Sequence, residues 1–125
     1  MAISRMSTGS APFEFDWQQL KQLAGEDAAF ENELLQMFLQ DARSSLEKLE
    51  KAIATRRIQA VEDTAHSLRG ASANVGALAL AATARRLEEL ARSGQLDEAK
   101  ALLQVMNSHC ERIQISLRSR LKEGE

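Results

Sequence analysis

Apolar residues recur every three or four positions along most of this 125-residue chain, and no segment alternates apolar and polar residues with a period of two. Intervals of three and four place side chains on one face of an α-helix, whereas a half-buried strand requires strict alternation. β-Branched residues, which favour strands, are also few. The pattern therefore predicts an all-α fold.

Five helices are expected from the apolar stripes and from the residues that favour helix ends. Their predicted ranges are Asp16–Ala24, Asp27–Thr55, Ile58–Val75, Leu78–Arg92 and Leu96–Leu121. The stripe of the second range comprises Phe30, Leu34, Phe38, Leu46, Leu49 and Ile53, and that of the last comprises Ala99, Leu103, Met106, Cys110, Ile113, Leu117 and Leu121.

The predicted loops are only a few residues long, which makes consecutive helices antiparallel neighbours. We therefore expect an up-down antiparallel four-helix bundle over residues 14–122, with Trp17 and Leu20 of the short N-terminal helix capping one end. Residues 1–13 are rich in serine, glycine and other small residues and are expected to form a flexible tail or linker. Residues 123–125 are expected to form a C-terminal tail.

Composition excludes several classes of function. The net charge of −2, the aromatic content of 4% and the absence of tyrosine argue against a nucleic-acid-binding surface. The single cysteine excludes an internal disulfide. No apolar run approaches the roughly 18 residues of a membrane span. We expect a cytoplasmic protein that binds neither membranes nor nucleic acid.

The helix expected at Ile58–Val75 carries a histidine on its polar side. Its apolar stripe consists of Ile58, Val61, Ala65, Leu68, Ser72 and Val75. On a helical wheel His66 lies about 130° from the centre of this stripe, so its imidazole is expected to reach solvent. The neighbours one turn away on either side are Glu62, Asp63, Arg69 and Gly70.

The turn that follows His66 lacks large side chains. Gly70 costs a helix roughly 1 kcal/mol relative to alanine, and Ala73 adds only a methyl group. This bare surface would let another protein approach the imidazole, while Arg69 supplies a positive charge for an anion on the ring. A neutral imidazole is a nucleophile without a helper base, and a phosphoryl group suits the neighbouring guanidinium.

Phosphoryl transfer also requires Mg²⁺ ligands and a phosphate cradle. The chain contains no glycine-rich phosphate loop. We therefore expect a partner to supply the metal and the phosphoryl donor, and we expect this chain to have no cofactor and no kinase activity of its own.

The segment AHSLRGASANVGA, residues 65–77, resembles the signature of histidine-containing phosphotransfer (Hpt) domains. That signature has a histidine, a basic residue three positions later, a glycine four later, a small residue six later and a Gly-Ala turn that ends the helix. The matching residues are His66, Arg69, Gly70, Ser72, Gly76 and Ala77. The basic residue is more often lysine in the family.

The resemblance implies a carrier that relays phosphoryl groups between aspartates of receiver domains in response regulators or hybrid histidine kinases, with Mg²⁺ bound in the receiver. It implies that His66 is the phosphoacceptor, that Arg69 stabilises the phosphoryl group and that Gly70 admits the receiver. Glu88 matches a position where the family often has Gln or Glu that orients the imidazole; otherwise it is one charge on a polar face.

Further residues are candidates for receiver docking. They are Glu62, Asp63, Ser67, Ala73 and Asn74, with Leu35 and Leu39 as the apolar part of the patch. Burial in the bundle explains the two leucines equally well. Ser72 falls on the apolar stripe, and its hydroxyl is expected to donate to the carbonyl of Leu68.

Two other functions remain open. The phosphoacceptor segment of a sensor histidine kinase is a dimeric helical hairpin with an acidic residue after the histidine, where this chain has Ser67; the Hpt interpretation expects a monomer. A helical adaptor with an incidental histidine is the second alternative. His109 and Cys110 do not indicate a metal site, because adjacent helical residues point about 100° apart.

Overall fold

The computed structural model describes residues 14–123, and over this range the chain forms five helices and no strand. The all-α prediction is therefore confirmed. The predicted tail at residues 1–13 and the last two residues of the predicted 123–125 tail lie outside the described range. No helix within residues 14–123 combines the length and apolar character needed to cross a membrane.

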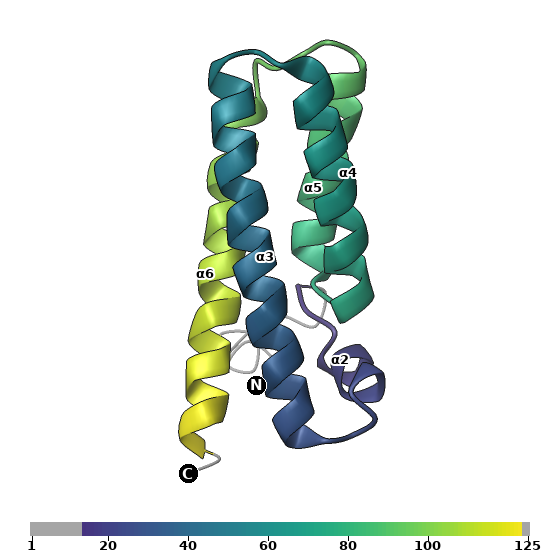
Figure 1. Cartoon of the computed structure of the whole chain (residues 1–125), viewed down its shortest axis with the longest axis vertical. Coiled ribbons are helices and arrows are strands. Elements are labelled where there is room, and N and C mark those ends of the chain that lie inside the picture. Colours follow the sequence, from purple (N-terminus) through teal and green to yellow (C-terminus); the bar gives the residue numbers. More distant parts are fainter. Residues whose placement is uncertain (1–13, 124–125) are drawn as a thin grey trace, which may run out of the picture.

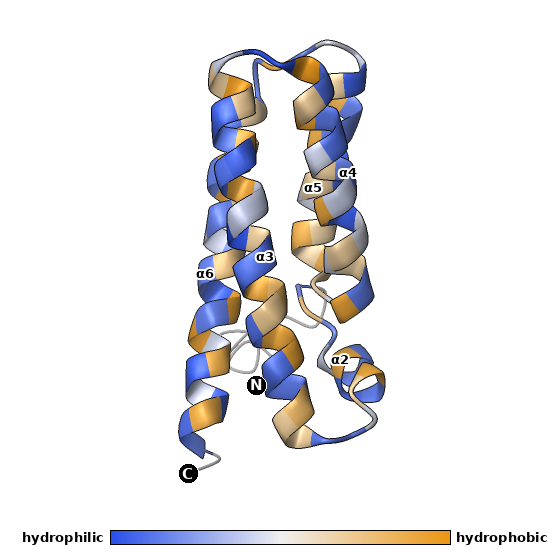
Figure 2. Cartoon of the chain, in the orientation of Figure 1, coloured by the Kyte–Doolittle hydropathy of each residue, from blue (hydrophilic) through white to orange (hydrophobic). Residues whose placement is uncertain are grey.

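The helices are α2 (Trp17–Leu23), α3 (Ala28–Ala54), α4 (Ile58–Val75), α5 (Leu78–Arg92) and α6 (Ala99–Glu123). The four long helices lie side by side, with α2 across the end where α3 begins (Figure 1). Helix α3 contacts α4 and α6, helix α5 contacts the same two helices, and the α4–α5 contact is the most extensive. Figure 2 shows that each long helix carries both apolar and polar residues.

Helix boundaries follow the capping residues. The carboxylates of Asp16 and Asp27 accept hydrogen bonds from the backbone N–H groups of Gln19 and Phe30, each at 3.1 Å, and so begin α2 and α3. Helix α4 ends as predicted at Gly76, whose φ of +95° lies in the left-handed region.

Gly76 also lies where two segments of backbone meet. The N–H of Asp16 donates to the Gly76 carbonyl at 2.7 Å, and the N–H of Ala79 donates to the Glu14 carbonyl at 3.1 Å. A Cβ atom on Gly76 would lie 2.6 Å from the Asp16 carbonyl oxygen. The segment before α2 is thus hydrogen-bonded to both sides of the α4–α5 turn, and only glycine fits there.

The two ends of the core differ from the sequence expectation. Helix α6 begins at Ala99 rather than at Leu96, because Leu96 is buried from a loop, and it extends to Glu123. Phe30 and Leu121 were expected in the apolar stripes but are exposed, since both lie near helix ends beyond the packed core. Leu20 is fully buried and Trp17 packs against the core cluster, so α2 closes one end of the core.

Candidate functional site

His66 lies on the outer face of α4, as predicted. Val61, Ala65 and Leu68 are buried on the opposite face, and the imidazole consequently points away from the core. Its side chain is 63% exposed. A partner can therefore reach the ring without any rearrangement of the helices.

Glu88 of α5 binds this imidazole. Its Oε2 lies 2.8 Å from Nδ1 of His66, although the carboxylate itself is only 5% exposed. The expectation of an ordinary charge on a polar face is therefore wrong: Glu88 faces α4 and is buried in the helix interface. A carboxylate accepts a hydrogen bond, so the neutral imidazole carries its proton on Nδ1 and leaves the lone pair of Nε2 free.

Two arginines bind the same carboxylate. Nε of Arg69 donates to Glu88 Oε1 at 2.7 Å, and Nη2 of Arg92 donates to Oε2 at 3.0 Å. The pKa of Glu88 is held below its ordinary value, chiefly because Arg69 hydrogen-bonds to the carboxylate and further because His66 does, while burial opposes the shift. Glu88 is therefore an anion at neutral pH.

Arg69 lies beside the ring nitrogen that bears the proton. Its Nη2 is 3.0 Å from Nδ1 of His66. When Nδ1 donates to Glu88 this approach brings two donors together, so the ring proton is directed to the carboxylate and the guanidinium is held by Glu88 instead. The sequence had placed the positive charge of Arg69 next to an anion on the ring. In the structure the guanidinium lies against Nδ1, whereas the nitrogen with the free lone pair is Nε2.

Both the sequence and the fold of this chain are similar to those of known proteins. The sequence model of the Hpt domain matches residues 33–116. The chain belongs to the Hpt domain family. Its fold is similar to the crystal structure of histidine-containing phosphotransfer protein B (HptB) from Pseudomonas aeruginosa PAO1, with a TM-score of 0.82 and 34% sequence identity over 90% of this chain and 98% of that chain. No curated protein sequence matches the chain.

The surface of this Hpt domain next to His66 is open at Gly70. A Cβ atom built there would meet nothing within 4 Å, so the glycine is not required for packing inside the molecule. Ser67, Ala73 and Asn74 are exposed on the same face. The carbonyls of Ala73 and Asn74 accept hydrogen bonds from the Gln19 side chain at 2.6 and 2.9 Å, which places α2 at the border of this face.

The acidic docking candidates differ in their surroundings. Asp63 is exposed and accepts a hydrogen bond from Gln59 at 2.9 Å, within the same helix. Glu62 is half-buried and accepts from Nε of Arg92 at 3.2 Å. Glu62 therefore belongs to the polar network between α4 and α5, together with Glu88.

Leu35 and Leu39 were expected in the docking patch, and the structure contradicts this. Both are buried in the core cluster, with 0% and 3% of their surface exposed. The physical reason is that α3 packs against both α4 and α6, which makes its buried face wider than one stripe. The alternative explanation, burial in the bundle, is the correct one.

The expected hydrogen bond of Ser72 is also wrong. Its hydroxyl is buried and makes no hydrogen bond within the described residues. Ser72 therefore contributes a small side chain to the buried face of α4.

Arg92 is the residue of this site that the sequence analysis missed. It lies one turn after Glu88 on α5 and pairs with it, as oppositely charged residues four apart on a helix often do. That spacing could have suggested the pair. Its second partner, Glu62, depends on how α4 and α5 lie against each other, which the sequence spacing does not give.

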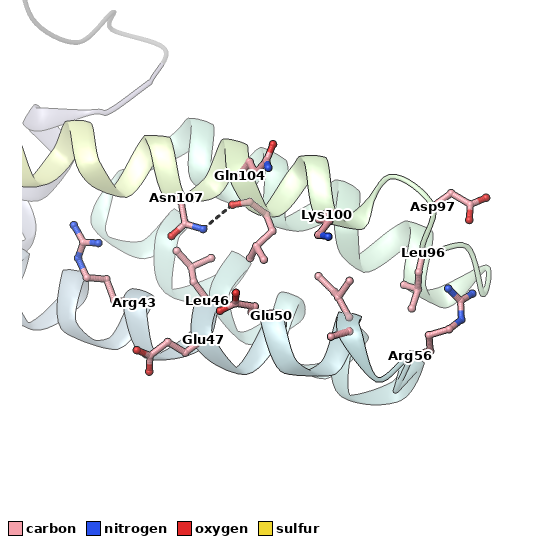
Figure 3. Close-up of a pocket in the computed structure, with 13 residues that line it drawn as sticks. Arg43, Leu46, Glu47, Glu50, Arg56, Leu96, Asp97, Lys100, Gln104 and Asn107 are labelled. Atoms are coloured by element: carbon pink, nitrogen blue, oxygen red, sulfur yellow. Dashed lines mark hydrogen bonds between the residues drawn. The ribbon is translucent and has the colours of Figure 1, made fainter.

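A groove lies elsewhere in the described part of the chain. It has a volume of about 820 Å³ and is lined by residues of α3, α6 and the loop before α6, including Leu46, Glu50, Leu96 and Lys100 (Figure 3). It contains neither His66 nor any other predicted site residue. This groove is therefore separate from the candidate site at His66.

The remaining chemistry-bearing groups are away from His66. Cys110 is buried on α6, and burial raises the pKa of its thiol to about 11, which leaves it protonated. Within residues 14–123 no three His, Cys, Asp or Glu side chains come together as a metal site would need.

Proposed function

We propose that this protein is a phosphorelay carrier in which Nε2 of His66 accepts a phosphoryl group from a receiver-domain aspartate and passes it to a second receiver. The observation that carries the proposal is the pairing of an exposed imidazole with a buried carboxylate through Nδ1. Membership of the Hpt domain family supports it. The scaffold of this carrier is the up-down antiparallel four-helix bundle that the loop lengths predict.

The transfer step needs no proton movement to or from solvent. The Nε2 lone pair forms the N–P bond as the P–O bond to the donor aspartate breaks, and the aspartate leaves as a carboxylate. The ring keeps its Nδ1 proton and gains one positive charge. Glu88 faces that charge at 2.8 Å from Nδ1, so it stabilises the phosphorylated ring more than the free one.

Arg69 and Gly70 complete the proposed site. The Arg69 side chain is partly exposed and is held by Glu88 through Nε, with Nη2 3.0 Å from Nδ1 of His66. To bind a phosphoryl oxygen on Nε2, the guanidinium would turn from Nδ1 toward that side of the ring. Gly70 gives a receiver room to approach the imidazole, next to Ser67, Ala73 and Asn74. Mg²⁺ belongs to the receiver, where it offsets the charge of the transferring group.

We further propose that the protein acts as a monomer in the cytoplasm, without kinase activity, and that its partners are receiver domains of response regulators or hybrid histidine kinases. Transient docking of this kind requires only a modest interface. A sizing column distinguishes this monomer from the dimeric phosphoacceptor segment of a histidine kinase.

The decisive experiment is phosphoryl transfer from several phosphorylated receiver domains to the native protein and to His66→Gln. The expected result is label on the native chain that survives alkali, is lost in acid and is absent from the variant. If no receiver labels the native chain, or if His66→Gln is labelled equally, the carrier function is wrong and the helical adaptor becomes the better explanation.

A further inference from the structure

Arg92 connects the two helices that carry the candidate site. Its Nε donates to Glu62 of α4 at 3.2 Å and its Nη2 donates to Glu88 of α5 at 3.0 Å. Both carboxylates are more buried than the arginine, whose side chain is 60% exposed. One planar guanidinium thus joins two acidic side chains that sequence position alone does not bring together.

The oxygen that Arg92 binds is the one that binds the histidine. Oε2 of Glu88 accepts hydrogen bonds from Nδ1 of His66 and Nη2 of Arg92, while Oε1 accepts one from Nε of Arg69. A carboxylate with one cationic partner would hold an imidazolium strongly, and an imidazolium has no lone pair on Nε2. A carboxylate shared with two guanidiniums attracts the ring proton less.

We propose that Arg92 is a positioning residue for the phosphoryl-accepting reaction: it acts through Glu88, holding the carboxylate toward His66 while offsetting its charge, so that the imidazole is oriented and yet stays neutral. The role of Arg92 in phosphoryl acceptance rests on the proposed function. The effect of Arg92 on the protonation of His66 does not depend on any partner.

The charged groups near the site come from two helices. Glu88 and Arg69 contact the His66 ring, and Glu62 and Asp63 precede His66 by one turn on α4. Arg85, Glu89 and Arg92 of α5 line a shallow hollow together with Arg69 and Glu88. Arg85 pairs with Glu89 at 3.3 Å and, among the described residues, makes no hydrogen bond or ion pair with Glu88 or His66. It borders the same shallow hollow as Arg92. Arg85 is therefore a matched control for losing one positive charge on this face of α5.

The test follows the protonation of both imidazoles by NMR in the native protein, Arg92→Gln and Arg85→Gln. The chain has only two histidines, so His66→Gln assigns the signals, and His109 on α6 serves as an internal reference. We expect Arg92→Gln to raise the titration midpoint of His66 by about 0.3–0.7 pH unit, a two- to fivefold change in the ratio of protonated to neutral ring. Arg85→Gln is expected to give less than a third of that shift, with His109 unmoved.

The second readout is the pH dependence of phosphorylation by phosphoramidate, a small phosphoryl donor that needs no receiver. Relative to the native protein, Arg92→Gln should accept phosphate about two- to fivefold more slowly below the His66 midpoint than well above it. Arg92→Lys keeps the charge but cannot bind both carboxylates with a rigid fork. Its His66 midpoint should therefore lie between those of the native protein and Arg92→Gln. A residue that only supports the fold would lower the rate by the same factor at every pH.

An unchanged His66 midpoint in a folded Arg92→Gln protein would overturn the inference, as would an equal shift in Arg85→Gln. Circular dichroism confirms folding of each variant. Failure of the proposed function is a separate outcome: receivers would then leave the native protein unlabelled, whatever the NMR titration of His66 reports.

Discussion

Replacing Gly70 by alanine should stabilise this protein, although glycine is the residue that the family signature has at that position. Gly70 lies inside α4 with ordinary helical backbone angles, and a Cβ atom there would meet nothing within 4 Å. The added methyl group therefore creates no clash. It only restricts the unfolded chain and improves the local helix propensity.

The expected gain is about 0.5–1 kcal/mol in the free energy of unfolding, the usual difference between glycine and alanine in a helix interior. For a chain of this length that corresponds to a rise of roughly 2–5 °C in Tm. Urea unfolding followed by circular dichroism measures the first quantity, and thermal unfolding measures the second.

The same position should behave oppositely in transfer from a receiver. Gly70→Leu adds a side chain whose Cβ meets nothing within 4 Å in the free protein. The variant should therefore fold and yet slow transfer from a phosphorylated receiver about tenfold or more, because docking would be displaced by an ångström or so. Phosphorylation by phosphoramidate should remain near the native rate. Ala101→Leu is the matched control, since Ala101 is exposed on α6 and α6 does not contact α4.

Two results would refute this reasoning. A Gly70→Ala protein less stable than the native one would mean that the glycine has a structural role within the helix. A Gly70→Leu protein that receives phosphate from receivers at the native rate would mean that the bare surface is not where the partner docks.

Three further perturbations have defined outcomes. Gly76→Ala should destabilise the fold by about 2–4 kcal/mol, because the new Cβ would meet the Asp16 carbonyl oxygen at 2.6 Å in a left-handed conformation; urea unfolding measures the loss, and a loss below 1 kcal/mol contradicts the stated cause. Ser72→Ala should be neutral or stabilising by up to about 1 kcal/mol, since it removes a buried hydroxyl without a partner; clear destabilisation in the same assay would reveal a bond that the structure lacks. Burial, and then the neighbouring Arg112, lower the pKa of His109 from its ordinary 6.5. The unfolded chain therefore binds more protons, and the free energy of unfolding should fall as the pH drops below about 6.5. His109→Gln should make the free energy of unfolding less dependent on pH in this range, and an unchanged dependence would exclude His109 as its source.

The sequence was sufficient for the helices where end signals and periodicity agree. The predicted ranges of α4 and α5 match the structure residue for residue, because Gly76 and the Ser93-Gly94 pair end them. The start of α6 was misplaced, since Leu96 is buried from a loop and hydrophobicity alone does not distinguish loop burial from helix burial. Leu35 was misassigned because a helical wheel does not reveal how many neighbours a helix has.

The candidate site was predictable only in its local half. His66, Arg69 and Gly70 lie on one helix, so their common face follows from the period of that helix. The contacts of Glu88 and Arg92 with α4 depend on how two helices are positioned against each other along their length, and no spacing within one helix encodes that. Glu88 entered the prediction through the resemblance, and Arg92 did not enter it at all.

The hydrogen-bonded turn at Gly76 fixes the relative position of His66, ten residues before it, and Glu88, twelve residues after it. Counting along the chain, His66 precedes the turn by about as many residues as Glu88 follows it, so the two side chains meet only while the turn keeps its length. One inserted residue would rotate α5 by about 100° and advance it by about 1.5 Å, enough to carry the carboxylate away from Nδ1. The Glu14 and Asp16 backbone bonds hold that turn in place. The length of this turn therefore decides whether His66 and Glu88 meet, and an insertion or deletion there should separate them even where Gly76 itself is kept.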